Sequence, residues 1–165
     1  MNPGADMLIC LTAAIITLLI AIFAVDWRNF REWVVVFLFQ GELDLTLGSL
    51  VVESNLLEYP VRIWPKLYDT SVLFEFWVLP VLCILYNQIV DSRNFRIKLY
   101  YAVLFSAGIT VVEYLLEANT DLINYIIWSW PMTFISVTLA FLVSHAFLIF
   151  YRRGCKYFGQ KRTES

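Results

Sequence analysis

The sequence carries little charge and few residues that bind metals. Charged residues make up 16% of its 165 positions, and the formal net charge is −2. So small a charge argues against a nucleic-acid partner, which needs a basic surface. The chain has one histidine, and its three cysteines, Cys10, Cys83 and Cys155, have no metal-like spacing. We therefore predict neither a metal site nor a disulfide.

The motifs of common enzyme classes are also missing. The chain has no glycine-rich phosphate loop, no paired zinc ligands and no serine with a histidine at nearby helical spacing. We therefore expect no enzymatic activity, no catalytic residue and no cofactor. One alternative stays open, which is intramembrane acid chemistry that pairs Glu42 or Asp44 with Glu113.

Hydrophobic residues dominate what is present. They make up 60% of the chain, and the mean hydropathy of +0.69 lies well above that of soluble globular domains. A spanning helix needs about 20 mainly apolar residues. Five segments meet this requirement: 7–25, 33–52, 72–90, 98–117 and 131–150. We therefore predict an all-α integral membrane bundle of five transmembrane helices, formed by a single membrane domain over residues 1–165.

The distribution of lysine and arginine predicts how the helices are oriented. None precedes the first apolar segment, which favours a retained helix over a signal peptide. If the N-terminus lies outside, ten of these residues fall on the cytoplasmic side and two on the outer side. Cytoplasmic loops are rich in them, so we predict an outside N-terminus and a cytoplasmic C-terminus. The long connection 53–71 is expected to cap the bundle at the outer leaflet.

Several ionisable side chains lie inside the predicted spans. A charged group near the bilayer centre costs about 2.5–3.5 kcal/mol, so such residues normally face the protein interior. We predict that they form an intramembrane polar cluster, arranged as a ladder across the hydrocarbon region. Its members are Glu42, Asp44, Glu75, Glu113 and His145.

Helical geometry limits this cluster. Glu42 and Asp44 are two residues apart, or about 200° around a helix, so a regular helix does not point both into one narrow cavity. Asp44 instead shares a face with Gln40, four residues before it. Pro80 interrupts the third span, and a kink there would open a pocket beside Glu75.

Three roles stay open for the cluster: hydrogen bonds between helices, a path for protons or cations, and a pocket for a small ligand or lipid. His145 has no second metal ligand at helical spacing, so a buried histidine is favoured, with Thr138 on the same face. Asn87 and Gln88, near the cytoplasmic end of the third span, are expected to meet lipid headgroups.

Five short motifs resemble a known family. They are DWRNFREW after the first span, Gly41-Glu42, Leu79-Pro80, Glu113-Tyr114 and His145. Over residues 7–152 they are similar to a family of small five-span membrane proteins of spore-forming Gram-positive bacteria, which has no established activity. That family has Asp after the glycine and Trp after the span-four acid, where this chain has Glu42 and Tyr114. The resemblance implies a bacterial plasma membrane and transfers no catalytic residue.

The sequence thus favours a multi-pass membrane protein with a structural, sensory or partner-binding role. The alternative is a proton- or cation-coupled transporter or conduit that uses the intramembrane carboxylates. The lipid bilayer is its expected surrounding. A membrane-protein partner and a homo-oligomer both stay open.

Overall fold

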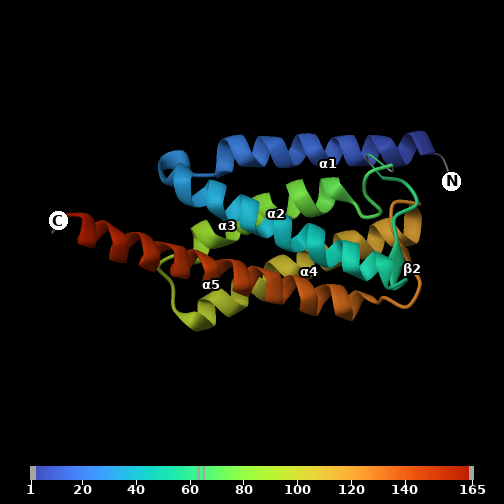
Figure 1. Cartoon of the computed structure of the whole chain (residues 1–165). Helices are drawn as coiled ribbons and strands as arrows, with labels where there is room; N and C mark the ends of the chain where they lie inside the picture. Colours follow the sequence, from blue (N-terminus) through green and yellow to red (C-terminus); the bar gives the residue numbers. More distant parts are fainter. Residues whose placement is uncertain (1–2, 63, 65, 164–165) are drawn as a thin grey trace.

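The protein is a bundle of five helices. The structure, a computed structural model, describes residues 3–62, 64 and 66–163. The helices are α1 (Pro3–Ala24), α2 (Phe30–Glu53), α3 (Leu79–Val90), α4 (Phe95–Asn119) and α5 (Trp130–Thr163). They lie side by side, with the N- and C-termini at opposite ends (Figure 1). The predicted all-α class is confirmed, and a two-residue pairing of β1 (Leu57–Glu58) with β2 (Asn124–Tyr125) is the one β ladder in the described ranges.

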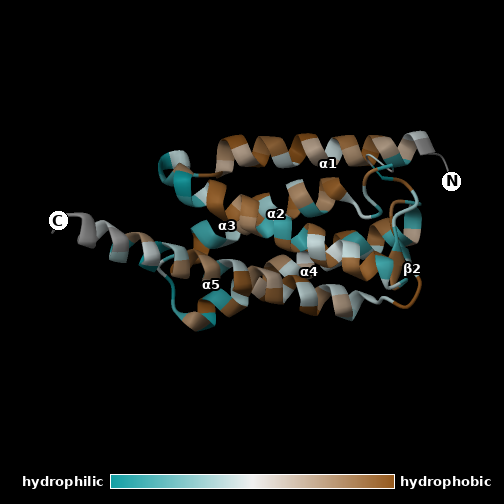
Figure 2. Ribbon diagram, in the orientation of Figure 1, coloured by the Kyte–Doolittle hydropathy of each residue, from teal (hydrophilic) through white to brown (hydrophobic). Residues whose placement is uncertain are grey.

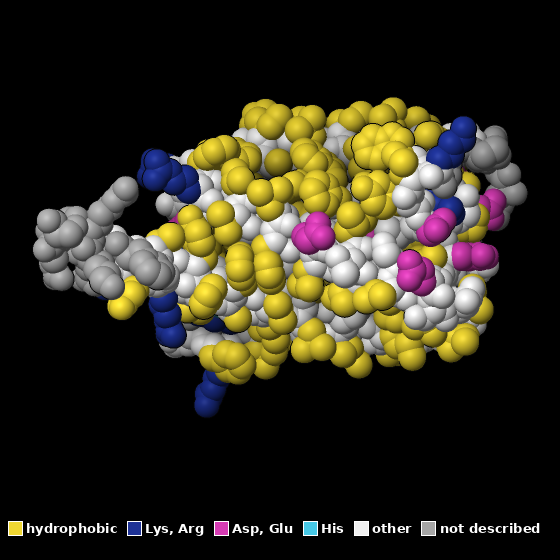
Figure 3. All heavy atoms as spheres, in the orientation of Figure 1, with side chains coloured by type: hydrophobic (Ala, Val, Ile, Leu, Met, Phe, Trp, Pro, Cys, Tyr) yellow, Lys and Arg dark blue, Asp and Glu magenta, His cyan; other side chains and the backbone are white. Residues whose placement is uncertain are grey.

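Four of the helices are long and apolar enough to cross a membrane. They cover Gly4–Ala24, Trp27–Glu53, Phe95–Asn119 and Trp130–Tyr157. The remaining apolar helix, Phe74–Val90, is shorter, and at ~1.5 Å per residue it extends about 25 Å along a hydrocarbon core ~30 Å thick. Hydrophobic residues recur along all five helices (Figure 2), and hydrophobic side chains cover much of the face seen in Figure 3. The predicted multi-pass membrane character is confirmed.

The segment DWRNFREW builds the turn between α1 and α2. Asp26 caps a short 3₁₀ helix, η1 (Trp27–Asn29), because its carboxylate accepts a hydrogen bond from the Arg28 amide at 3.2 Å. The Trp33 indole donates to the Asp26 carbonyl at 2.7 Å, and the Gln88 side chain accepts from the Asp26 amide at 2.8 Å. The motif therefore has a structural role, which is to tie the α1–α2 turn to α3.

The third apolar helix begins irregularly. A π-helical turn, η2 (Phe74–Val78), precedes α3, and the Leu79 amide donates to the Phe74 carbonyl five residues back. Pro80 follows and has no amide hydrogen to donate. A kink was expected at Pro80. The helix is instead irregular in the π-helical turn just before Pro80, and that turn contains Glu75.

Buried hydrophobic side chains fill the half of the bundle that contains the α1–α2 turn and the α3–α4 connection. The largest fully buried members of this group are Trp33, Val36, Tyr86, Val90, Phe141 and Leu148. Arg152 of α5 closes this end of the bundle. Its guanidinium donates to Glu32 of α2 at 3.0 and 2.6 Å and also bonds to Asp91, which follows α3. One cation therefore joins three helices.

One predicted boundary differs from the structure. α5 does not end near residue 150 but continues to Thr163, because the basic tail contains no proline and its two glycines are tolerated in a helix. The connection after α2, expected to act as a cap, folds over one end of the bundle, where β1 pairs with β2 and the Val61 amide donates to the Asp121 carbonyl at 3.2 Å. Residues 63 and 65 of this connection lie outside the described residues.

Candidate functional site: an acidic cavity between the helices

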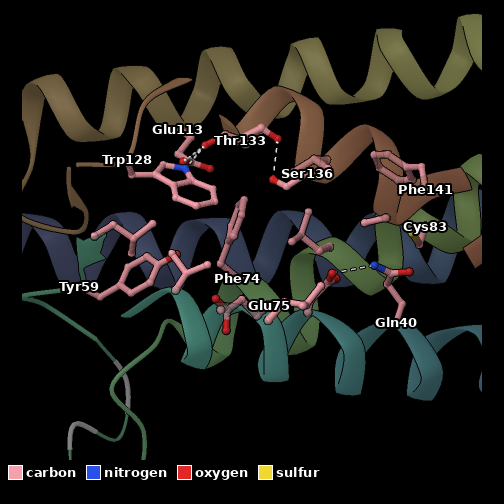
Figure 4. A pocket seen from close by; sticks show the side chains of 18 residues that line it. Gln40, Tyr59, Phe74, Glu75, Cys83, Glu113, Trp128, Thr133, Ser136 and Phe141 are labelled. Atoms are coloured by element: carbon pink, nitrogen blue, oxygen red, sulfur yellow. Dashed lines mark hydrogen bonds between the residues drawn. The ribbon is translucent and has the colours of Figure 1, made fainter. Parts of the chain in front are cut away.

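A cavity of about 120 Å³ lies in the half of the bundle opposite the Arg152 contacts (Figure 4). Four helices, the π turn and the two capping connections contribute to its wall. Its polar and aromatic lining consists of Gln40, Asp44, Tyr59, Phe74, Glu75, Cys83, Glu113, Trp128, Thr133, Ser136 and Phe141. Leu47 of α2 and Ser136 of α5 line it and are exposed, so the cavity opens between these two helices.

Asp44 enters the cavity from α2 together with Gln40. The two side chains lie one helical turn apart, and Gln40 Nε2 donates to Asp44 Oδ1 at 2.7 Å. Both residues are buried. Asp44 Oδ2 and Gln40 Oε1 are also buried, and neither has a hydrogen-bond partner among the described residues. This wall of the cavity therefore contains buried acceptor oxygens and no positive charge.

Glu75 enters from the π turn and lies against the backbone of α2. Thr70 Oγ1 donates to Glu75 Oε1 at 2.5 Å, whereas Oε2 is buried without a partner in the described part of the chain. A Cβ atom added at Gly48 would overlap the carboxyl group of Glu75. Any larger residue at position 48 would therefore require this carboxyl group to move.

Glu113 of α4 is the most fully hydrogen-bonded of the three acids. Its Oε1 accepts from the Tyr125 hydroxyl at 2.6 Å and from Thr133 Oγ1 at 2.7 Å. The Trp128 indole in turn donates to Thr133 Oγ1 at 2.8 Å. Burial and the bond to Glu113 raise the pKa of Tyr125 above its usual range, so its hydroxyl stays protonated and continues to donate. These bonds attach the connection before α5 to α4.

Tyr59 closes the cavity from the connection after α2. Burial raises the pKa of its hydroxyl well above the usual range, and the nearby Glu75 and Glu113 raise it further. The side chain is therefore neutral near pH 7. It contributes an aromatic ring and a hydroxyl to the lining, without a charge.

The electrostatic character of the site follows from this lining. Three carboxyl groups face one small space, and neither lysine nor arginine is among the residues that line it. Within the described residues, no group of three or more His, Cys, Asp or Glu side chains could hold a metal ion. The space instead combines acceptor oxygens with aromatic rings, an environment suited to an organic cation.

The structure brings together three of the five predicted cluster residues, Asp44, Glu75 and Glu113, and leaves two apart. Glu42 is exposed on the outer surface of α2, as expected from the ~200° between it and Asp44. The proposed ladder is therefore corrected at this position. His145 is buried but does not line the cavity.

His145 belongs to a neighbouring group of polar side chains. Its Nδ1 lies 2.9 Å from Asn87 Oδ1, and Asn87 Nδ2 donates to Ser144 Oγ at 3.1 Å and to the Cys83 carbonyl at 2.9 Å. Asn87 is fully buried, so the expectation that it meets lipid headgroups is wrong. The Thr138 hydroxyl donates to its own helix, at the Phe134 carbonyl, and so does not serve His145.

The sequence analysis did not predict the residues that the connections between helices contribute to the site. Tyr59, Thr70, Tyr125 and Trp128 lie outside the predicted spans, where aromatic content indicated only an interfacial location. Thr133 was missed because a lone threonine in a helix usually bonds to its own backbone. Comparisons of the chain with known protein families, with curated proteins and with solved structures found no match.

Proposed function

We propose that this is a non-enzymatic multi-pass membrane protein that binds a small organic cation in its acidic cavity, in a sensory or partner-binding role. The convergence of Asp44, Glu75 and Glu113 on one space without a lysine or arginine carries this proposal. Buried carboxylates need either a proton or a positive partner. Among the described residues, one oxygen each of Gln40, Asp44 and Glu75 is buried without a hydrogen-bond partner, and a proton or a cation would compensate it.

The lining favours a substituted ammonium ion over other cations. Its rings, which include Phe74 and Trp128, can contact the apolar groups of such an ion and stabilise its charge. A volume of about 120 Å³ is smaller than the ~300–1,000 Å³ of typical small-molecule sites. The ligand therefore has only a few non-hydrogen atoms. The opening between α2 and α5 would admit it from the side of the bundle.

The positions of Ser136 and His145 argue against a serine–histidine catalytic pair at this site. The Ser136 hydroxyl donates to the Thr133 carbonyl at 3.0 Å, and the chain's single histidine bonds to Asn87, away from the cavity. A nucleophile needs a base within hydrogen-bond reach. Neither side chain is placed as one half of such a pair.

The distribution of charge supports an orientation with the N-terminus outside and the C-terminus cytoplasmic, and the family resemblance supports a bacterial plasma membrane. Ten lysines and arginines then lie on the cytoplasmic side and two outside. In this orientation the cavity lies in the outer half of the membrane, beneath the capping connections. The proposal includes membership of the five-span family of spore-forming bacteria. The motifs around Asp26, Glu42, Glu113 and His145 support it.

Thermal unfolding of the purified protein in detergent tests the proposal. Tetramethylammonium and methylammonium, compared with sodium at equal ionic strength, should raise the Tm of the wild type, because a ligand that binds only the folded state stabilises it. The double variant Asp44→Asn, Glu75→Gln should lose this increase, whereas Glu117→Gln, outside the lining, should keep it. Equal Tm shifts with sodium, or in the double variant, would refute cation binding.

A proton or cation conduit is the second candidate, and one observation favours it. The polar group of Asn87, Ser144 and His145 adjoins the cavity through Cys83 and lies deeper in the bundle. Proton flux in proteoliposomes should then appear in the wild type and disappear in both Asp44→Asn and Asn87→Leu. Absence of flux in a wild type that still binds ammonium ions would exclude the conduit.

A further inference from the structure

One face of α2 carries polar side chains on the outside of the bundle. Glu42, Thr46, Ser49 and Glu53 follow one another at intervals of four, three and four residues, which places them in one stripe along the helix. Glu42, Thr46 and Glu53 are exposed, and Ser49 is half-buried. This stripe is separate from the cavity, because none of the four residues lines it.

Glu42 lies close to the middle of the membrane on this face. Gln40 is the midpoint of the span Trp27–Glu53, so Glu42 lies only ~3 Å further along the helix axis. A hydrocarbon core ~30 Å thick leaves about 12 Å between this depth and the nearer headgroups. A glutamate side chain does not bridge that distance, so the carboxyl group does not reach water by extending along the helix.

Nothing in the described parts of the chain compensates this carboxyl group. The hydrogen bonds and ion pairs of the described residues do not include Glu42, although Asp44 in the same helix is held by Gln40. Leu38 and Leu50, on the same side of α2, are also exposed. Figure 3 shows that this view of the molecule is largely hydrophobic, with one acidic side chain near its middle among hydrophobic and white atoms. A lone carboxyl group in lipid is costly, which indicates a partner outside the chain.

We propose that the stripe formed by Glu42, Thr46 and Ser49 docks a transmembrane helix of a different membrane protein that carries lysine or arginine near mid-depth. The cation would pair with Glu42. The hydroxyl groups of Thr46 and Ser49 are small, so a helix can approach closely and form hydrogen bonds with them. This interaction surface goes beyond the proposed cation binding and uses none of the cavity residues.

Charge complementarity favours a different protein over a second copy of the chain. Copies inserted with the same orientation run parallel, so α2 packed on α2 would place Glu42 against Glu42. The lysines and arginines of the chain lie in the outer turns of the candidate spans or beyond them, as with Arg31 and Lys98 near the starts of α2 and α4 and Arg152 late in the span Trp130–Tyr157. A second copy therefore offers no cation at the depth of Glu42.

Resonance energy transfer in liposomes tests this surface. The labelled protein is reconstituted with a synthetic leucine-rich transmembrane peptide that carries one central lysine, or with the same peptide carrying leucine there. The lysine peptide should bind the wild type about tenfold more tightly, as for a polar contact between membrane helices. Glu42→Gln should remove this preference. Asp44→Asn, which changes an inward-facing acid of the same helix, should retain it.

Several outcomes would overturn the proposal. The first is that the two peptides bind the wild type equally. The second is that Glu42→Gln still prefers the lysine peptide. The third is energy transfer between copies of the protein that Glu42→Gln abolishes. The last result would identify a second copy as the occupant. Thr46→Leu provides a second variant and should weaken binding of the lysine peptide while leaving Glu42 in place. Because Glu42 lies outside the cavity, the ammonium-dependent rise in Tm should persist in Glu42→Gln, so the two proposals fail separately.

Discussion

The acidic side chains at the two ends of the helix bundle differ in whether a positively charged residue lies beside them. At the end that contains the α1–α2 turn, Glu32 and Asp91 share the guanidinium of Arg152. At the other end, Asp44, Glu75 and Glu113 line one cavity, and neither lysine nor arginine is among the described residues that line it. The first arrangement neutralises charge within the chain, whereas the second leaves a requirement for a proton or a cation.

This difference separates the residues that hold the helices together from those available to a ligand. Around Arg152 each carboxylate belongs to a different helix or connection, so the ion pairs fix the positions of α2, α3 and α5. The cavity acids are held by neutral donors such as Thr70 and Tyr125, which position a carboxyl group without neutralising it. Uncompensated buried groups are expected at functional sites, where stability is sacrificed.

The largest effect should come from filling the space over Glu75. Gly48→Ala should lower the free energy of unfolding by about 1–3 kcal/mol, typical of overpacking, because the new Cβ would overlap the carboxyl group. Gly108→Ala is the matched control, since its added Cβ would meet nothing within 4 Å, and it should be neutral or stabilise the helix by up to about 1 kcal/mol. Unfolding in mixed detergent micelles measures both variants.

The same pair of variants also tests how the cavity is built. Gly48→Ala should abolish the Tm increase produced by tetramethylammonium, because Glu75 would leave its position, and Gly108→Ala should preserve it. If Gly48→Ala kept both the stability and the tetramethylammonium effect of the wild type, Glu75 would not lie against α2 in the way described.

Removal of the cation at the opposite end should have the next largest effect. Arg152→Gln leaves Glu32 and Asp91 without their shared positive partner. Because all three groups are partly exposed, the expected loss is about 1–2 kcal/mol, less than for a fully buried pair. Arg153→Gln, one residue later and exposed, should change stability by less than about 0.5 kcal/mol. Equal losses in both variants would show that the Arg152 contacts contribute nothing specific.

Much of the fold could be predicted from the sequence because hydrophobic length alone determines which segments can span a membrane. The helical segments and the inward face shared by Gln40 and Asp44 follow from hydropathy and from the helical repeat. The shorter third helix was harder to delimit. Its π turn depends on how Phe74 and Leu79 bond around Pro80, and local composition does not determine this.

The membership of the site was predicted less completely. Depth along a helix identified Asp44, Glu75 and Glu113, but depth does not give direction, so Glu42 and His145 were grouped with them. The partners of His145 depend on how α3 packs against α5, where Asn87 meets Ser144. The residues from the connections, such as Tyr59 and Trp128, reach the cavity through tertiary folding and have no periodic signal in the sequence.

The smallest effect gives the most direct comparison of the two ends, because the same chemical change is made at each. Glu32→Gln should destabilise the protein by about 0.5–1 kcal/mol, since it weakens a charge-assisted pair with Arg152. Asp44→Asn should change stability by less than about 0.5 kcal/mol, or increase it, because no cation is lost and the side chain can still bond to Gln40. Unfolding of both variants without ammonium ions measures the difference. A loss in Asp44→Asn as large as that in Glu32→Gln would mean that Asp44 stabilises the bundle as a charged group, and the two ends would then not differ in kind.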